Sequence, residues 1–397
     1  MGTLAIDDIG MLVTNDRGLG EGPLGIVRDA ALVVADGRVI AVEPAGAAAD
    51  GRLDAGGRCL IPGFVDSHTH LIFAGDRAEE FAARMAGRDY EAGGIRITTA
   101  ATRSAPDDVL RALAAARRAE GLRGGITHVE VKSGYGLDVA TERRSCALAA
   151  ELTDDATFLG AHVVPAEYEG RADDYVELVC GEMLAACAPL CRWIDVFCER
   201  GAFDAEQSRA VLEAGRAAGL GLRVHGNQLG PGPGARLAVE LDAASVDHCT
   251  YLDDADIEAL AASDTVATYL PATDFSTRQP YPDARRAIDA GVSVAIATNT
   301  NPGSSNTTSM PFCIALAVRD LRMSAEEALQ AATLGGARAL RRDDVGRLSP
   351  GARADACLLD AASYADFVYR PGVPLVAATL AGGALVAGSF DGGRGDG

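Results

Sequence analysis

Histidines that follow short apolar runs are the residues best placed to do chemistry in this chain. The six are His68, His70, His128, His162, His225 and His248. All except His128 come at or just after the end of a run that is typical of a buried β-strand. His68 and His70 are separated by one residue, and alternate residues of a strand face the same side. Both imidazoles can therefore point into one space and share a metal ion.

The apolar runs alternate with helical segments rich in Ala, Leu, Arg and Glu. Strands are predicted at 60–66, 126–132, 156–162, 193–198, 221–226, 244–248, 265–270 and 292–298. Helices are predicted between most of them, for example at 106–119, 172–188, 205–218, 254–262 and 325–340. Eight such strands favour an α/β fold of the (β/α)8 TIM-like barrel type, in which functional groups gather where the strands end.

Both ends of the chain are rich in short β-like runs punctuated by glycine. The runs 31–34 and 38–42 flank an Asp-Gly pair, which is a signal for a tight hairpin. A similar run at 384–387 lies near the C-terminus. We therefore expect a small composite β-domain built from both chain ends. The predicted division is a composite β-sandwich of 1–58 and 343–397 and a barrel domain of 59–342.

The chain of 397 residues has 36 basic and 56 acidic residues, a formal charge of −20. This acidic balance argues against nucleic acid or an anionic membrane as a partner, because like charges repel. The nine cysteines form no CxxC pair, so neither a disulfide framework nor a zinc ribbon is expected. The first residues lack the features of a signal peptide, and no apolar run approaches about 18 residues, so we expect a cytoplasmic protein.

Residues 62–70 (PGFVDSHTH) resemble the metal-binding motif on the first strand of the amidohydrolase superfamily. His225 and His248 resemble the histidines on the fifth and sixth strands of that superfamily. Further motifs from about residue 36 to 387 together resemble the imidazolonepropionase family within it. These motifs are 130–137 (EVKSGYGL), 195–199 (DVFCE), 224–229 (VHGNQL) and 301–305 (NPGSS).

The resemblance implies an enzyme of histidine catabolism that uses a single metal-activated water. It would open the ring of 4-imidazolone-5-propanoate, a small anionic imidazolone, to give N-formimino-L-glutamate. It implies one divalent metal ion, with His68, His70, His225 and Asn299 as its ligands. Three imidazoles and one oxygen ligand suit zinc (Zn2+) and iron (Fe2+ or Fe3+) alike. A homodimer is implied as well.

The resemblance also implies catalytic and substrate-binding roles for residues that match the family's motifs. Catalytic roles fall to His248, Gln228 and Asn299. The substrate-binding positions implied are Arg77, Tyr90, Tyr135, His162, Asn301, Gly303 and Ser304. A guanidinium pairs with a carboxylate through two hydrogen bonds, so Arg77 would bind the propanoate group.

Asn299 departs from the superfamily pattern, in which an aspartate at this strand end binds the metal and takes a proton from water. An amide oxygen can coordinate a metal, but neither Asn299 nor Gln228 can act as a base near neutral pH. His248 is therefore the proton acceptor that we expect. Three interpretations stay open: a tolerated lineage variant, an inactivating substitution, and a paralogue with altered chemistry. We favour the first, because the surrounding motif is undisturbed.

Two other functions stay open beside ring opening of the imidazolone. Deaminases and cyclic-amidine hydrolases of the superfamily use similar histidines, but residues 130–137 and Arg77 favour a ring that bears a propanoate. A binding protein that has lost catalysis is conceivable only because of Asn299.

Lys132 is the only lysine of the chain. Two-metal amidohydrolases bridge their metals with a carboxylated lysine on strand four, whereas Lys132 ends the second predicted strand. We therefore expect a single metal and expect Lys132 to order the rim loop.

Overall fold

The computed structural model describes residues 2–87 and 94–390, and the chain divides into two compact units. The first unit comprises residues 1–66, 119–128 and 309–397, and the second comprises 67–118 and 129–308. The predicted division at residues 58 and 343 differs from these bounds, because the segments 59–66, 119–128 and 309–342 group with the chain ends. The second unit contains every histidine except His128.

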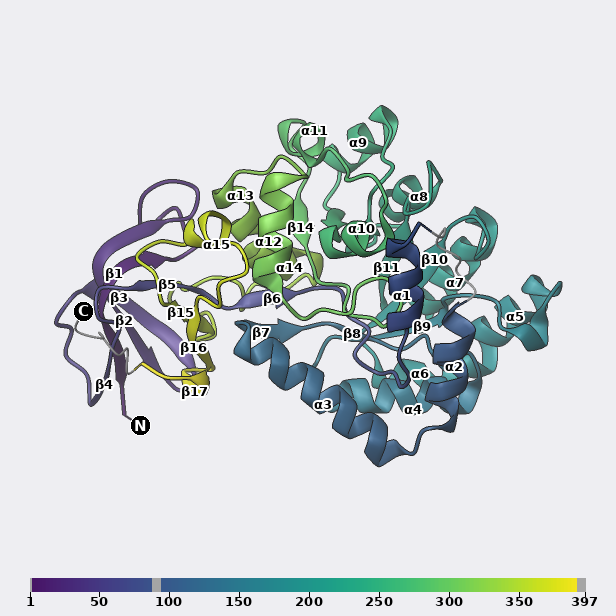
Figure 1. The fold of residues 1–397 in the computed structure, drawn as a ribbon, viewed down its shortest axis with the longest axis horizontal. Coiled ribbons are helices and arrows are strands. Elements are labelled where there is room, and N and C mark those ends of the chain that lie inside the picture. Colours follow the sequence, from purple (N-terminus) through teal and green to yellow (C-terminus); the bar gives the residue numbers. More distant parts are fainter. Residues whose placement is uncertain (1, 88–93, 391–397) are drawn as a thin grey trace. The chain divides into compact units, whose positions relative to one another are not determined.

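An eight-stranded sheet in the first unit takes strands from both ends of the chain (Figure 1). Its strands are β1 (Leu4–Val13), β2 (Ile26–Ala35), β3 (Arg38–Pro44), β4 (Gly51–Asp54), β5 (Cys59–Pro62), β15 (Ala356–Leu359), β16 (Val376–Ala381) and β17 (Ala384–Gly388). Their order is β17-β16-β15-β5-β1-β2-β3, with β4 paired to β1. Leu60 of β5 lies opposite both Leu12 and Leu358, so the N-terminal and C-terminal strands meet at this residue.

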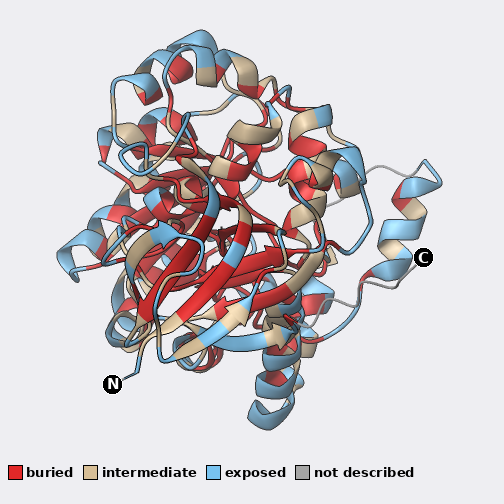
Figure 2. Ribbon diagram, turned by 90° about the vertical axis from the view of Figure 1, so that its left-hand side faces the viewer, coloured by how far each residue is buried: buried red, intermediate tan, exposed pale blue. Residues whose placement is uncertain are grey.

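The hairpin β2–β3 forms where the Asp-Gly pair predicts it. Asp36 and Gly37 have φ values of 50° and 75°, the left-handed backbone that a tight two-residue hairpin turn requires. The turn directs the apolar residues Leu32, Val34 and Val39 into the core of this sheet. Figure 2 shows buried residues running along the strands, with exposed residues on the outer turns of the helices.

Seven parallel strands form the sheet of the second unit, in the order in which they occur along the chain (Figure 1). They are β8 (Val131–Lys132), β9 (Ala156–Ala161), β10 (Trp193–Cys198), β11 (Gly221–Gly226), β12 (Ser245–His248), β13 (Val266–Tyr269) and β14 (Val294–Ile296). Strands β9 to β12 are buried almost throughout, as expected of parallel strands covered on both faces. The short strands β6 (Phe64–Asp66) and β7 (Ile126–Val129) pair with each other.

Helices connect most of these strands. They are α1 (Ala78–Met85), α2 (Ile95–Ser104), α3 (Asp107–Arg123), α4 (Val139–Ala150), α5 (Ala172–Leu178), α6 (Leu184–Cys187), α7 (Ala205–Ala217), α8 (Gly234–Glu240), α9 (Asp254–Ala261), α10 (Pro271–Thr277), α11 (Ala284–Asp289), α12 (Met310–Arg319), α13 (Ala325–Gln330), α14 (Gly336–Ala339) and α15 (Asp366–Tyr369). Single turns of 3-10 or π-helix occur at Ala166–Tyr168, Val179–Met183, Ala188–Leu190 and Ala331–Gly335. Within residues 2–87 and 94–390, no helix is both long and apolar enough to cross a membrane.

Several helices begin at residues that cap their first turn. Asp204 before α7 accepts the N–H of Gln207, whose side chain accepts the N–H of Asp204 in return. The same reciprocal arrangement starts α13 between Ser324 and Glu327. Such caps satisfy N–H groups that the first helical turn leaves without partners, so these boundaries are encoded locally.

Each of the eight predicted strand segments contains strand structure, but the first two are interrupted. Gly63 separates β5 from β6, and Glu130 separates β7 from β8. At Gly63 a Cβ atom would lie 2.2 Å from the hydroxyl of Thr127, so only glycine allows this close approach.

Residues 67–70 are held at both edges of the seven-stranded sheet, and this places the first two histidines. At the β8 edge, the N–H of Lys132 donates to the carbonyl of Thr69 at 2.9 Å. Beyond β14, the N–H of Asn299 donates to the carbonyl of His68 at 3.0 Å, and the N–H of His70 donates to the carbonyl of Thr300 at 2.9 Å. The sheet is therefore curled so that its two edges share one segment.

We expect Leu12→Ala and Leu358→Ala each to lower the free energy of unfolding by about 2–5 kcal/mol, because each empties a buried site in one shared core. Chemical denaturation measures the change. Leu385 is 47% exposed, and Leu385→Ala is the control that should change stability by less than about 0.5 kcal/mol. A small effect of either buried substitution would contradict a core shared by both chain ends.

Candidate metal centre and active site

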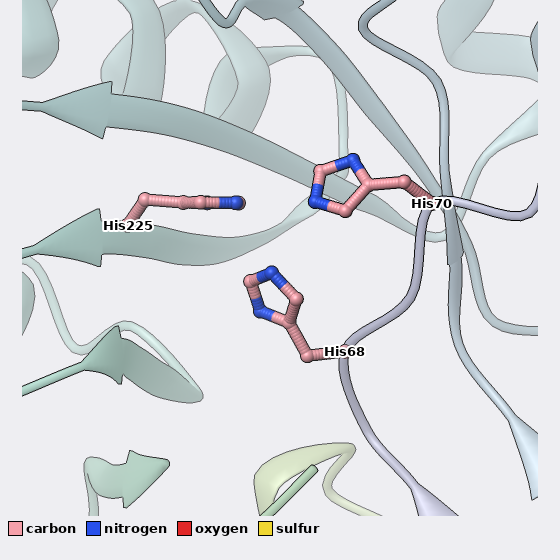
Figure 3. A group of neighbouring side chains, drawn as sticks. All are labelled: His68, His70 and His225. Atoms are coloured by element: carbon pink, nitrogen blue, oxygen red, sulfur yellow. The ribbon is translucent and has the colours of Figure 1, made fainter. Parts of the chain in front are cut away.

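Three histidines converge where the strands of the curled sheet end (Figure 3). His68 and His70 come from the segment after β6, and His225 comes from β11. Each offers a ring nitrogen, and the three nitrogens lie within 4.8 Å of one another. All three side chains are buried. This is the spacing and chemistry of a three-imidazole site for a divalent transition metal.

Two buried aspartates orient these rings. The Nδ1 of His68 donates to the carboxylate of Asp247 at 2.8 Å, and the Nδ1 of His225 donates to Asp195 at 3.0 Å. Each bond fixes the tautomer in which Nε2 has a free lone pair. Among the residues that the structure describes, the buried Nε2 atoms of His68 and His225 have no hydrogen-bond partner. The donor set therefore fits a metal ion.

A network of buried charges holds the two aspartates. Lys132 Nζ lies 2.8 Å from carboxylate oxygens of both Glu130 and Asp195. Arg223 Nη2 lies 3.1 Å from Asp247 Oδ2 and also donates to the carbonyl of Ser67 at 2.7 Å. The side chains that form these ion pairs are fully buried. Lys132 therefore binds carboxylates inside the unit, and the expectation that it orders the rim loop is replaced by this role.

Burial and neighbouring charges set the protonation of these groups. Burial lowers the pKa of His68 and His70 well below the usual value, so both are neutral and able to ligate a metal. Burial opposes ionisation of Asp195, but His225 and Lys132 together hold the pKa of that carboxyl below its usual value. Asp247 behaves in the same way, with Arg223 as the principal cation that lowers its pKa against burial.

Asn299 lies beyond β14, and only one of the two polar atoms of its amide forms a hydrogen bond within the described residues. Its Nδ2 donates to the hydroxyl of Thr273 at 2.8 Å. Its Oδ1 is buried and has no hydrogen-bond partner among the described residues. Asn299 adopts a φ of 52°, a left-handed conformation that asparagine tolerates better than most residues. The free oxygen is the atom that this amide could offer to a cation or to water.

His248 lies close to the three-histidine group. Its ring centroid is 5.5 Å from that of His225 and 5.8 Å from that of His68. Burial lowers the pKa of His248 well below its usual value, so the ring is neutral at physiological pH. Its Nδ1 has no hydrogen-bond partner in the described part of the chain. A neutral imidazole in this position can accept a proton.

One pocket brings most of the sequence-predicted site residues together. It is lined by His70, Arg77, Ile95, Tyr135, His162, Phe197, His225, Gln228, Leu229, His248, Asn299, Asn301 and Ser304. Sequence reasoning missed Ile95, Phe197 and Leu229. Phe197 and Leu229 lie inside motifs that were recognised, so their motif positions were the available signal. Tyr90 lies outside the described residues.

Arg77 is a buried cation in this pocket. Its Nε and Nη2 donate to the two carboxylate oxygens of Glu80, both at 2.7 Å. A Cβ atom on Gly303 would lie 2.1 Å from Arg77 Nη1, so the guanidinium rests directly against the backbone of Gly303. The absence of a side chain at Gly303 therefore makes room for the arginine.

The loop at 301–305 is stabilised by its own side chains. Asn301 Oδ1 accepts the N–H groups of Gly303 and Ser304, both at 2.8 Å. Asn301 Nδ2 donates to the carbonyl of Asn299 at 2.6 Å and to Ser304 Oγ at 2.9 Å. Both ends of the Asn301 amide are thus used inside the loop. Asn301 shapes the loop and lines the pocket, and its direct contact with the ligand stays a prediction.

Aromatic rings line the side of the pocket nearest to His70. His162 stacks on His70 with ring centroids 5.4 Å apart and planes inclined by 18°. The ring centroid of Tyr135 lies 5.4 Å from that of His162. Burial lowers the pKa of His162 to about 4, so this ring is neutral as well.

Gln228 lines the same pocket and is held by its backbone. Glu199 accepts the N–H of Gln228 at 2.9 Å and so fixes the turn that carries Gln228.

Comparisons with known proteins agree with this geometry. A model of the amidohydrolase family matches residues 234–386. The imidazolonepropionase of Mycolicibacterium smegmatis is 64% identical over 388 residues, which cover 97% of this chain and 98% of that protein. The imidazolonepropionase of Salinispora tropica is 64% identical over 387 residues, with coverages of 96% and 98%.

A solved structure shows the same fold at low sequence identity. The atrazine chlorohydrolase TrzN from Arthrobacter aurescens TC1, complexed with zinc, matches with a TM-score of 0.73 and 19% identity. The match covers 99% of this chain and 97% of that chain. The fold is therefore shared beyond the imidazolonepropionases.

We expect Asp195→Asn to weaken metal binding about 10–100-fold, because the amide cannot hold the His225 tautomer as the carboxylate does. Competition with a chelator measures the affinity. Asp155→Asn is a matched control, since Asp155 is equally buried but accepts from Trp193 Nε1 and Arg192 Nη1, both at 2.9 Å, and neither residue is a proposed metal ligand. Equal affinities in the two variants would contradict the orienting role of Asp195.

Proposed function

The chain belongs to the imidazolonepropionase family of amidohydrolases, and from this premise we propose how its pocket performs the family's reaction. It is a metal-dependent hydrolase that opens the ring of 4-imidazolone-5-propanoate to N-formimino-L-glutamate in histidine degradation. One water adds across the ring amide: the C–N bond breaks, carbon takes the hydroxyl and nitrogen takes a proton. The observation that supports this most directly is a three-imidazole group of which two members, His70 and His225, line one pocket with the buried Arg77.

We propose that the seven-stranded sheet of the second unit, together with residues 67–70, forms the interior of a (β/α)8 barrel. Support comes from the seven parallel strands in chain order and from residues 67–70, which hydrogen-bond to both edges of their sheet. The predicted barrel domain of 59–342 and composite β-sandwich of 1–58 and 343–397 remain part of this proposal. A homodimer and a cytoplasmic location also remain proposals.

His68, His70 and His225 would hold one divalent metal ion, with Asn299 Oδ1 as a further oxygen ligand. When bound, the metal supplies Lewis acidity toward water and toward the ring carbonyl. Asp195 and Asp247 keep the two histidines that they contact in the ligating tautomer. The donor atoms suit zinc and iron equally, so the identity of the metal stays open.

His248 is the residue that we assign to proton transfer. It is neutral and buried beside the three-histidine group, and its Nδ1 is available. It would take the proton of the attacking water and deliver it to the leaving ring nitrogen. Gln228 and Asn299 cannot exchange protons near neutral pH, so they act by hydrogen bonding and orientation.

Arg77 would bind the propanoate of the substrate. The edge of its guanidinium formed by Nε and Nη2 is engaged by Glu80, and Gly303 packs against Nη1. These contacts restrain the guanidinium, so little conformational entropy is lost when a carboxylate binds. In a chain of net charge −20, this guanidinium together with the metal ion would supply the positive charge that meets an anionic substrate in the pocket.

The remaining substrate contacts follow from the pocket's shape. Tyr135 and His162 offer flat faces with polar atoms at their edges, which suit a polar heterocycle. Ser304 lies in the 301–305 loop that Asn301 stabilises, and Tyr90 keeps the role assigned from the sequence. Deamination of a related ring is the alternative chemistry on this fold, but a buried arginine in the pocket favours a ring that bears a carboxylate.

The test of this function is turnover of authentic 4-imidazolone-5-propanoate. We expect N-formimino-L-glutamate without ammonia and loss of turnover when a chelator removes the metal. Release of ammonia would instead show a deaminase, and bound metal without turnover would show a binding protein. Asn299→Asp should change turnover by less than about tenfold (roughly 1.4 kcal/mol) if the amide is a tolerated variant. A larger gain would mean that Asn299 is a damaging substitution.

Arg77→Lys should raise KM for the imidazolone propanoate about tenfold or more while kcat changes little, because a lysine cannot form the two-bond pair. An imidazolone with an ethyl group in place of the propanoate should be a poor substrate of the unmodified enzyme. The Arg77→Lys substitution should lower kcat/KM for this ethyl analogue only slightly further. Arg117→Lys is the control, since Arg117 donates to the carbonyls of Leu71 and Phe73 outside the pocket. Additive losses would rule out the assigned contact.

A further inference from the structure

Glu142 is a buried acid on α4 that takes no part in the proposed reaction, yet it contacts the loop that presents Tyr135. Its Oε2 accepts the N–H of Gly134 at 3.0 Å. Its Oε1 accepts the N–H of Gly136 at 2.7 Å and the N–H of Leu137 at 2.8 Å. The side chain of Glu142 has no exposed surface. One carboxyl group therefore accepts three backbone N–H groups, one from the residue before Tyr135 and two from the residues that follow it.

The backbone of this loop needs such an anchor. Leu137 has a φ of 56°, in the left-handed region that leucine rarely adopts, and Gly134 has a φ of 108°. A conformation of this kind persists only when its surroundings hold it. Converging N–H groups form a concave site for an acceptor, and the carboxyl group of Glu142 fills it. Burial raises the pKa of Glu142 to about 7, while the hydrogen bonds from Leu137 and Gly136 oppose that shift.

The loop also reaches the second aromatic residue of the pocket. The carbonyl of Gly134 accepts a hydrogen bond from Nδ1 of His162 at 2.9 Å. That bond places the proton on Nδ1 and leaves Nε2 of His162 as an acceptor. Tyr135 lies between the two glycines whose N–H groups Glu142 binds. Both Tyr135 and His162 line the pocket.

We propose that Glu142 is a positioning residue for substrate binding, which acts through the 133–137 loop to place the Tyr135 ring and to orient His162. It touches neither the substrate nor the metal ligands. This inference rests on the proposed function, since it assigns the two aromatic residues to the bound imidazolone. Glu142 would thus be a residue that affects substrate specificity although it lies behind the pocket and outside the motif at 130–137.

The direct test is Glu142→Gln, which keeps the shape of the side chain but turns one acceptor oxygen into an NH2 group facing N–H donors. We expect KM for 4-imidazolone-5-propanoate to rise about tenfold or more, with kcat changed less than about threefold, because ground-state contacts are lost. Metal content should not change. Hydrogen exchange in peptides that span 133–138 should become about tenfold faster or more.

Asp155→Asn is the matched control for general destabilisation. Asp155 is also fully buried and hydrogen-bonded, but to Trp193 and Arg192. We expect this control to lower thermal stability while KM and the exchange of the 133–138 peptides stay unchanged. Equal shifts of KM in Glu142→Gln and Asp155→Asn would overturn the proposal, because a purely structural role predicts that result.

A second variant serves if Glu142→Gln does not fold. In Gly136→Ala the added Cβ would lie 2.8 Å from backbone and side-chain atoms of Thr141 and from the Glu142 N–H nitrogen, so the loop must shift while the carboxylate remains. The same rise in KM is expected. If the unmodified protein does not turn over the imidazolone at all, the proposed function fails. Hydrogen exchange and calorimetric binding of imidazole-4-propanoate then decide the role of Glu142, and unchanged values in the variant would reject it.

Discussion

The buried charge network beneath the three histidines is the constraint on which the rest of the site depends. Lys132 and Arg223 form ion pairs with the carboxylates of Glu130, Asp195 and Asp247, and none of these side chains reaches solvent. A buried charge without a partner is costly, so each member requires the others in place. The two aspartates then hold the metal-facing tautomers, and the geometry of the pocket follows from the position of the histidines.

The network forms because strand periodicity stacks charged and ligating residues on the same side of the sheet. Arg223 and His225 are two residues apart on β11, so the arginine lies one layer below the histidine. Asp247 and His248 are adjacent and would normally face opposite sides. His248 has a φ of 87°, and this turn of the backbone lets Asp247 contact His68 while His248 lines the pocket. A strained backbone at a strand end thus lets two neighbouring residues face one site.

Much of the fold and the site could be predicted because the signals are local. Apolar runs indicated the strands, and segments rich in Ala, Leu, Arg and Glu indicated the helices between them. Histidines at strand ends indicated a shared site, since parallel strands end at one edge. The role of Lys132 was not predictable in this way. Its partner Asp195 is 63 residues away, and an isolated lysine in a motif gives no sign that it will be fully buried. The donors that Glu142 binds around Tyr135 are only 5 to 8 residues away, but no local pattern indicates that this acid is fully buried.

By itself, the sequence determined which residue types stand at the strand ends and hence the class of chemistry: imidazoles for a metal, an arginine for a carboxylate, and an amide at position 299 in place of an acid. Only the tertiary structure decided how those groups are oriented and which charges face one another. Hydrogen bonds such as those from His68 to Asp247 and from Lys132 to Asp195 depend on side-chain direction and burial. Those properties arise when distant strands pack together, and no local pattern in the chain encodes them.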